Sequence, residues 1–247
     1  MTIKHSQHRK SGLTMMIDTG LSIRESEDFI SSCSEYTNIV KFAFGTSLLT
    51  PNLKEKVNLF HKHNILVHAG GTLFEYFAIR DQITEYKKFL EKNNINMVEI
   101  SDGCIDIDHD QKCNIIKDFK KDFKVISEVG RKNNLEKNKL ENWPIWIQKE
   151  LEAGSWKVIT ESRESGNTGI YNTDGNIEKE MVNEIINKVK IEDILWEAPK
   201  KKQQAWFINE FGSNVNLGNI GYKDILSLEC LRRGMRADTF SNFLNIK

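Results

Sequence analysis

The chain has 247 residues, and its 35 Lys and Arg residues balance its 35 Asp and Glu residues, so the formal net charge at pH 7 is zero. A chain without net charge has no global field that attracts nucleic acid or an acidic membrane, and no apolar stretch approaches the roughly 18 residues of a membrane span. We therefore expect a cytoplasmic protein with no nucleic-acid partner and no membrane partner.

The four cysteines are far apart and form no CxxC pair, which argues against a zinc knuckle or a secreted disulfide framework. The first residues are polar and basic, and we expect residues 1–12 to form an N-terminal extension. The rest of the chain, residues 13–247, has the length of one α/β barrel domain. We also expect a homo-oligomer.

Apolar, β-branched runs predict eight strands, near residues 13–18, 38–44, 65–69, 97–101, 124–129, 157–162, 193–198 and 214–219. Between them, apolar residues recur at spacings of three and four and predict amphipathic helices, for example over 53–63, 79–93 and 177–189. Eight successive βα units predict a single-domain α/β fold, a closed (β/α)8 TIM barrel. An open doubly wound sheet is the alternative, but it gathers its site at one crevice, whereas polar residues end nearly every strand here.

Lys41 lies inside the apolar run of the second predicted strand. A lysine in this setting must either reach solvent with its ammonium group or pair with an anion. We take Lys41 as a candidate catalytic residue.

The third predicted strand is followed by Gly70, Gly71 and Thr72. Two glycines at a strand-to-helix turn allow backbone N–H groups to approach a phosphate or carboxylate at the helix start, so these three residues are candidate substrate ligands. Thr72 and Glu75 also have the spacing of a capping box, in which Thr72 is the N-cap.

Strands four to seven each end on a glutamate, and these glutamates are 29 to 36 residues apart: Glu99, Glu128, Glu161 and Glu197. Carboxylates at the carboxyl ends of successive parallel strands converge on one mouth. Four buried negative charges require a cation or bound protons. The pattern predicts a metal-assisted enzyme in which these glutamates are the metal ligands.

Basic side chains follow two of these strands. Lys132 lies just beyond strand five and Arg163 follows strand six, where Lys132 can act as a general acid and Arg163 can bind a carboxylate or sulfonate. A surface role for Lys132 is the alternative. The charged segment 131–141 reads as a solvated loop, and the glycine-rich segment 167–175 is long enough to act as a lid.

The eighth predicted strand contains Asn216, Gly218 and Asn219. Phosphate sites in this fold are often built from the loops after strands seven and eight. The two asparagines supply amide donors and the glycine gives close backbone access, so all three are candidate substrate ligands.

An ordered set of motifs resembles the phosphosulfolactate synthase family over about residues 12 to 240: GGTLFE (70–75), VEISDG (98–103), SEVGRK (127–132), ESRESG (161–166), WEAP (196–199), VNLGNI (215–220) and LECLRRGMRADT (228–239). The resemblance implies a (β/α)8 lyase that adds sulfite to phosphoenolpyruvate in the presence of Mg²⁺ and forms (2R)-phospho-3-sulfolactate. The product can feed coenzyme M synthesis or sulfolactate production. The resemblance also implies that Lys132 is the proton donor.

One position departs from the family pattern. The family usually has a lysine after the aspartate of strand one, whereas this chain has Thr19 after Asp18. Two other functions therefore stay open. The first is a related barrel lyase or aldolase that acts on another phosphorylated enol, and the second is a catalytically silent barrel like the heat-stress-associated group of plants.

Overall fold

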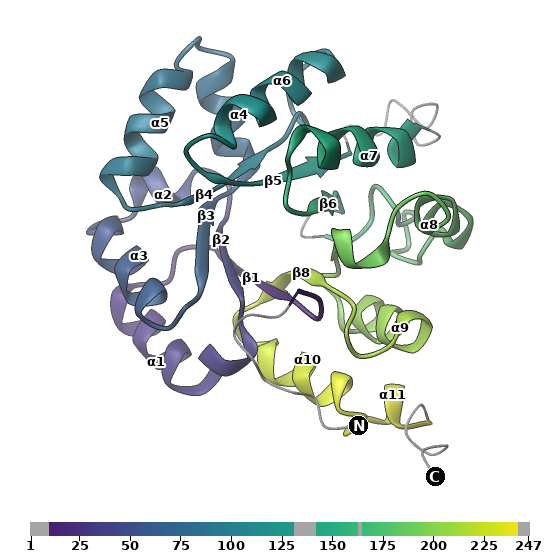
Figure 1. The fold of residues 1–247 in the computed structure, drawn as a ribbon. Coiled ribbons are helices and arrows are strands. Elements are labelled where there is room, and N and C mark those ends of the chain that lie inside the picture. The colour runs from purple at the N-terminus through teal and green to yellow at the C-terminus, as the bar shows by residue number, and fades with distance from the viewer. Residues whose placement is uncertain (1–9, 131–141, 163–164, 242–247) are drawn as a thin grey trace.

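The computed structural model describes residues 10–130, 142–162 and 165–241, and within them eight parallel strands close into a barrel. Each strand pairs with the next, and β1 also pairs with β8 (Figure 1). The predicted (β/α)8 barrel is therefore confirmed, and the open sheet is excluded. The strands are β1 (Thr14–Asp18), β2 (Ile39–Phe42), β3 (Leu66–Ala69), β4 (Met97–Ile100), β5 (Lys124–Val129), β6 (Val158–Thr160), β7 (Ile194–Glu197) and β8 (Leu217–Gly221).

Helices surround the barrel on its outer side (Figure 1). They are α1 (Ile23–Cys33), α2 (Thr46–Leu49), α3 (Leu53–Lys62), α4 (Gly71–Ala78), α5 (Ile83–Lys92), α6 (His109–Phe119), α7 (Trp143–Ala153), α8 (Lys179–Ile186), α9 (Lys201–Phe211), α10 (Ile225–Arg232) and α11 (Ala237–Phe240). None of these helices combines the length and the apolarity that crossing a bilayer requires.

Local sequence explains where several helices begin and end. Asn142 is the N-cap of α7 and Pro144 lies in its first turn, where the missing N–H is tolerated. The helix ends before Gly154, whose φ of 123° suits glycine. The helix predicted over 79–93 begins only at Ile83, because α4 extends to Ala78 and Asp81 has a left-handed φ of 54°.

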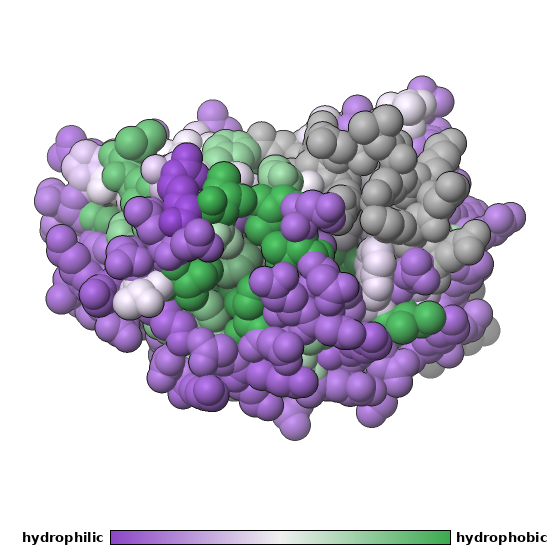
Figure 2. All heavy atoms as spheres, turned by 90° about the horizontal axis from the view of Figure 1, so that it is seen from above, coloured by the Kyte–Doolittle hydropathy of each residue, from purple (hydrophilic) through white to green (hydrophobic). Residues whose placement is uncertain are grey.

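Two apolar regions hold the fold together. The larger one lies between the strands and the helix layer. The smaller one fills the barrel interior and consists of Leu13, Met15, Ile39, Met97, Ile126, Ile159 and Leu195. Because alternate residues of a strand face the same side, the residue two positions after an interior apolar residue also points inward, nearer the carboxyl end. Figure 2 shows one side of the molecule, where hydrophilic residues form most of the surface and hydrophobic residues gather near its centre.

Candidate active site

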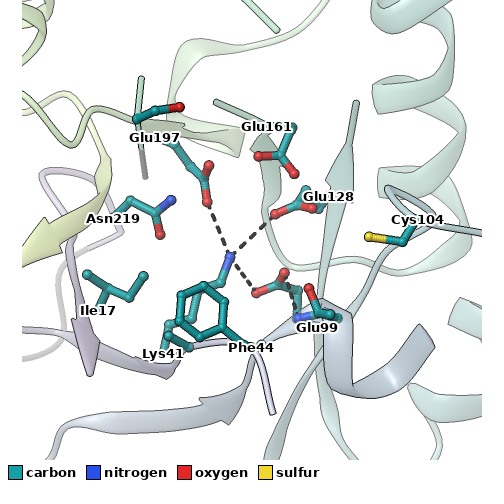
Figure 3. Close-up of a pocket in the computed structure, with 14 residues that line it drawn as sticks. Ile17, Lys41, Phe44, Glu99, Cys104, Glu128, Glu161, Glu197 and Asn219 are labelled. Atoms are coloured by element: carbon teal, nitrogen blue, oxygen red, sulfur yellow. Dashed lines mark hydrogen bonds and ion pairs between the residues drawn. The ribbon is translucent and has the colours of Figure 1, made fainter. Parts of the chain in front are cut away.

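A cavity of about 470 Å³ opens at the carboxyl end of the barrel (Figure 3). Charged and polar side chains line its floor, and apolar side chains line one wall. The lining residues are Ile17, Lys41, Ala43, Phe44, Gly70, Gly71, Thr72, Glu99, Cys104, Glu128, Glu161, Ser165, Glu197 and Asn219.

The strand period places all four predicted glutamates in this cavity. Each follows by two residues an apolar side chain of the barrel interior, namely Met97, Ile126, Ile159 or Leu195. A carboxylate layer therefore lies directly above the apolar layer. All four glutamates are at most 2% exposed. Their predicted convergence on one mouth is confirmed.

Lys41 reaches the centre of this carboxylate layer from β2 (Figure 3). Its Nζ lies 3.2 Å from Glu99 Oε2, 3.2 Å from Glu197 Oε1 and 3.4 Å from Glu128 Oε2. A charge-assisted N–H···O⁻ bond is usually about 2.7–2.9 Å long. The three carboxylates thus share one ammonium group, and the prediction that Lys41 pairs with anions is confirmed.

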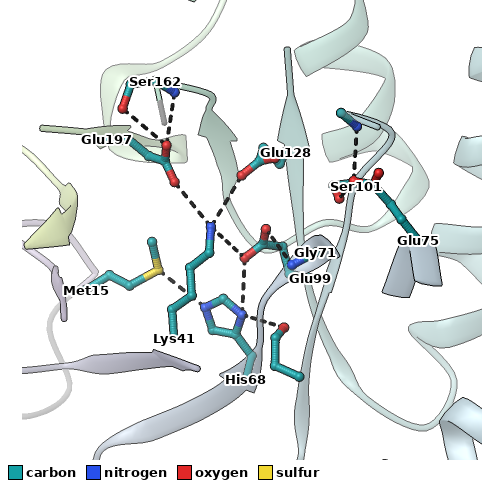
Figure 4. A network of polar contacts seen from close by, with 12 residues as sticks. Met15, Lys41, His68, Gly71, Glu75, Glu99, Ser101, Glu128, Ser162 and Glu197 are labelled. Carbon is teal, nitrogen blue, oxygen red and sulfur yellow. Dashed lines mark hydrogen bonds and ion pairs between the residues drawn. The ribbon is translucent and has the colours of Figure 1, made fainter. Parts of the chain in front are cut away.

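Other polar groups orient two of these carboxylates (Figure 4). The Gly71 N–H donates to Glu99 Oε1 at 2.9 Å, and His68 Nδ1 lies 3.3 Å from Glu99 Oε2. The Ser162 N–H and hydroxyl both donate to Glu197 Oε2, at 3.0 and 3.2 Å. Glu99 and Glu197 are therefore fixed by groups outside the ion cluster.

Burial and the neighbouring charges have opposite effects on the pKa values in this cluster. Burial raises the pKa of Glu99 to about 8, although Lys41 lowers it, and burial likewise raises the pKa of Glu197. Burial opposes the charged form of Lys41, but Glu99, Glu197 and Glu128 outweigh it and raise its pKa well above the usual value. Burial lowers the pKa of His68 to about 3, so His68 is a neutral partner of Glu99 at pH 7.

Within the described residues, four buried carboxyl groups surround Lys41. Carboxylate oxygens are the hard ligands that Mg²⁺ prefers. The donor type thus fits the predicted metal. In the described parts of the chain, no three or more His, Cys, Asp or Glu side chains are arranged so that they could hold a metal ion, and Lys41 stands where the carboxylates converge. The metal ligands stay a prediction.

The predicted capping box at Thr72 and Glu75 is wrong. The N-cap of α4 is Gly70, so Thr72 is already inside the helix. Glu75 instead accepts hydrogen bonds from the loop after β4: the Ser101 hydroxyl and the Gly103 N–H donate to its Oε1, and the Cys104 N–H donates to its Oε2. Glu75 therefore fixes a wall of the cavity.

The two glycines at this turn are needed for close packing. A Cβ on Gly71 would lie 2.6 Å from Glu99 Oε1, and a Cβ on Gly70 would lie 2.9 Å from the Phe42 carbonyl oxygen. The Gly71 N–H, predicted to bind an anionic substrate, already binds the carboxylate of Glu99. Gly70 and Thr72 do line the cavity, as predicted.

The prediction for strand eight is only partly right. The strand begins at Leu217 and extends to Gly221, so Asn216 lies at its amino end, away from the cavity. Asn216 accepts from the Leu13 N–H and donates to the carbonyl groups of Glu192 and Ile194. It therefore joins neighbouring strands and does not bind substrate.

The next two residues of strand eight differ in their surroundings. Gly218 packs against the barrel interior, because a Cβ there would lie 2.3 Å from Leu195 Cδ2. It is not a cavity residue either. Asn219 does line the cavity, with a left-handed φ of 54° that asparagine tolerates better than most residues.

Lys132 and Arg163 lie outside the described residues, as does the predicted solvated loop 131–141. The glycine-rich segment predicted as a lid contacts β7 and α9, and its role as a lid stays a prediction. Tyr171 is buried and donates its hydroxyl to the Glu197 carbonyl at 2.5 Å, and Gln203 donates to the carbonyl groups of Gly166 and Gly175.

Lys112 supports the site from outside the barrel and is absent from the sequence prediction. Its buried Nζ on α6 donates to the Glu128 carbonyl at 2.6 Å and lies 2.8 Å from carboxylate oxygens of Asp102 and Glu150. It thereby fixes the backbone of β5 beside the cavity. The available signal was a lysine on the same helix face as the apolar residues Ile116 and Phe119.

Comparisons with known proteins agree with this geometry. A sequence model of the (2R)-phospho-3-sulfolactate synthase (ComA) family matches residues 3–238. The chain is 37% identical to phosphosulfolactate synthase of Bacillus subtilis (strain 168), over 97% of this chain and 96% of that protein. It is 40% identical to phosphosulfolactate synthase of Methanocaldococcus jannaschii, over 93% of this chain and 94% of that protein.

Among solved structures, the chain resembles 3-hexulose-6-phosphate synthase from Salmonella typhimurium, with a TM-score of 0.53, 13% identity and 93% coverage of both chains. At this identity the likeness shows the barrel fold alone. The family match extends over residues 3–238, almost the whole chain. The chain therefore belongs to the (2R)-phospho-3-sulfolactate synthase family.

Proposed function

We propose that this protein adds sulfite to phosphoenolpyruvate and forms (2R)-phospho-3-sulfolactate in a Mg²⁺-dependent reaction. Membership of the family carries the proposal, because its curated relatives are named for this product. Among the described residues, the ammonium group of Lys41 and four buried carboxyl groups line the mouth, which supports the proposal because such a set suits anionic substrates together with a cation.

The proposed reaction forms one C–S bond and then adds one proton. The sulfur lone pair of sulfite forms a C–S bond to the methylene carbon of phosphoenolpyruvate, and the double-bond electrons move to the phosphate-bearing carbon and its carboxylate. That carbon then takes a proton from one face, and the C–O–P linkage stays intact. Lys132 is the proposed proton donor, on the resemblance of its sequence motif.

Cationic and polar groups hold the two anions together. Lys41 would bind one anionic group of substrate, and Gly70, Thr72 and Asn219 line the same cavity and would position the rest. Arg163 is the proposed partner of a second anionic group. Glu99, Glu128, Glu161 and Glu197 would hold Mg²⁺, which supplies Lewis-acid stabilisation of the charge that develops on the substrate carboxylate.

The test is incubation of the protein with phosphoenolpyruvate, sulfite and Mg²⁺, followed by mass analysis. We expect a sulfonated adduct of phosphoenolpyruvate only when all three are present. We also expect Lys41→Met to form no product, whereas Lys149→Met, which removes an exposed lysine of α7, keeps wild-type turnover. An adduct that forms equally well without metal, or no adduct in the complete mixture, would overturn the proposal.

A further inference from the structure

We propose that Phe44 limits the substrate range of this protein. Its ring lies beside the methylene carbon of the bound enol phosphate, so that only an unsubstituted methylene group fits. The inference rests on the proposed function, because it takes phosphoenolpyruvate to be the substrate. It goes further in assigning the selection among enol phosphates to one residue.

The cavity has a polar side and an apolar side, and Phe44 belongs to the apolar side (Figure 3). Strands β4 to β7 place carboxyl groups two residues after the apolar layer of the barrel interior. Strand β1 instead places Ile17 there, two residues after Met15. Ala43 and Phe44 follow β2 and line the cavity together with Ile17. This division orients a small ligand that has charged and apolar parts.

The backbone conformation of Phe44 is unfavourable for an aromatic residue. Its φ is 53°, in the left-handed region where the Cβ atom crowds the following carbonyl group. The other non-glycine residues with a positive φ in the described parts of the chain are all Asn or Asp, namely Asn52, Asn64, Asp81, Asn94 and Asn219. Phe44 thus stands where this fold otherwise uses Asn, Asp or Gly.

Backbone hydrogen bonds beside Phe44 fix this turn. The Ala43 N–H donates to the Asp18 carbonyl at 2.9 Å, and the Thr46 N–H donates to the Ala43 carbonyl at 3.0 Å. These bonds involve only main-chain atoms, so the turn does not require an aromatic side chain. A glycine at position 44 would adopt the same φ without strain.

The Phe44 ring also adds little to the packing of the fold. It is 48% exposed and belongs to neither apolar region of the barrel. Within the described parts of the chain it makes no ring–ring or cation–π contact. An exposed ring on a strained backbone lowers stability, and such residues are concentrated at ligand sites. Because the ring lines the cavity, a bound substrate would cover it.

The structure of phosphoenolpyruvate indicates which part of it meets Phe44. Its phosphate and carboxylate are charged and belong at the polar side of the cavity. Its methylene carbon, to which sulfite adds, is its apolar part and faces the apolar side. A substituent on this carbon would meet the Phe44 ring, whereas the unsubstituted carbon fits beside it.

The test compares phosphoenolpyruvate with phosphoenol-α-ketobutyrate, which has a methyl group on the methylene carbon. The kcat/KM for sulfonated product is measured with sulfite and Mg²⁺ in the wild type, Phe44→Ala and Phe44→Gly. We expect the preference of the wild type for phosphoenolpyruvate to fall by about tenfold or more in both variants, because one methyl group typically changes kcat/KM by about 10–200-fold.

Leu49→Ala is the matched control. Leu49 is also an exposed apolar residue, on α2, and it is not among the residues that line the cavity. This variant should keep the wild-type preference. An unchanged preference in Phe44→Ala would overturn the inference. If Phe44→Ala also changes the oligomeric state in size-exclusion chromatography, a second copy of the chain covers the ring instead.

Thermal unfolding separates selection from a structural role. Phe44→Gly should unfold at a higher temperature than Phe44→Ala, because glycine relieves the strain at this φ. Both variants should stay close to the wild type, since the ring packs on no apolar region of the barrel. Failure of both variants to fold would show that the ring stabilises the protein, and that result contradicts the inference.

The wild type distinguishes this inference from the proposed function. If the wild type forms no sulfonated product from phosphoenolpyruvate, the proposed function is refuted and the inference with it. If the wild type forms the product and Phe44→Ala keeps the same preference, only the inference is refuted.

Discussion

Two buried lysines, Lys56 on α3 and Lys41 on β2, have their carboxylate partners arranged in different ways. Lys56 and Asp18 are both 0% exposed and form a one-to-one pair at 2.6 Å. Lys56 also donates to the Leu21 carbonyl, and Asp18 accepts the N–H groups of Gly20 and Leu21. Lys41, by contrast, faces four carboxylates and has no short contact with any of them.

The difference separates a structural pair from a functional cluster. A balanced pair satisfies its own charges and needs no ligand, so Lys56 and Asp18 stabilise the loop after β1 in every state of the protein. A cluster in which several buried carboxyl groups share the ammonium group of Lys41 has a charge that depends on bound protons, metal or substrate. We therefore expect substitutions in the two places to change stability in opposite directions.

The largest expected loss of stability is at the balanced pair. Lys56→Met leaves the Asp18 carboxylate buried without its partner, which typically costs about 3–5 kcal/mol. Chemical denaturation of the wild type and the variant measures this free energy of unfolding. A loss below about 1 kcal/mol would mean that the Lys56–Asp18 pair does not stabilise the fold. Lys56 could then not serve as the structural reference for Lys41.

A pH effect of similar size is expected at Glu150, the buried partner of Lys112 on α7. Burial raises the pKa of Glu150 from 4.5 to about 7, although Lys112 lowers it. The folded state therefore binds more protons than the unfolded state between these values, and stability falls as pH rises from about 4.5 to 7, by roughly 3 kcal/mol. Glu150→Gln should flatten this part of the pH profile of unfolding, and an identical slope in the variant contradicts the assignment.

Removing a charge from the carboxyl cluster around Lys41 should instead stabilise the metal-free protein. Glu128→Gln reduces repulsion among the buried carboxylates, and we expect a gain of about 1–2 kcal/mol together with a fall in turnover of about a hundredfold or more. Thermal unfolding without metal and steady-state product formation measure the two effects. A variant that is both less stable and fully active would contradict the distinction between the Lys56–Asp18 pair and the cluster around Lys41.

The smallest expected effect lies at the N-terminal cap of α1. Ser22 and Glu25 form the capping box of α1, and Ser22→Ala should cost about 1 kcal/mol of stability. Turnover per folded molecule should stay at the wild-type value. This variant gives the baseline for a loss of stability that has no effect on chemistry.

Much of the fold could be predicted because local pattern decides it. The strand-end glutamates and Lys41 interrupt apolar runs, and the strand period alone then places them inside the barrel mouth. The pattern places strand eight three residues too early, because Gly218 and Gly221 weaken its apolar character, and so it misplaces Asn216 relative to the cavity.

The supporting contacts could not be predicted, because they depend on how distant elements pack. Glu75 binds a loop 26 to 29 residues away, and its spacing from Thr72 indicated only a local cap. Lys112 meets the Glu128 carbonyl and Glu150 only once α6 and α7 lie side by side against β5. The three shared contacts of Lys41 likewise depend on distances that no linear pattern contains.

The central claim is that the strand-end glutamates at the barrel mouth bind a divalent cation. Its most direct test is the thermal unfolding temperature of the wild-type protein as a function of Mg²⁺ concentration, without substrates. The account predicts a rise that follows saturable binding and is much reduced in Glu128→Gln, because a ligand of the folded state stabilises it. An unfolding temperature that does not change with Mg²⁺ would contradict the account.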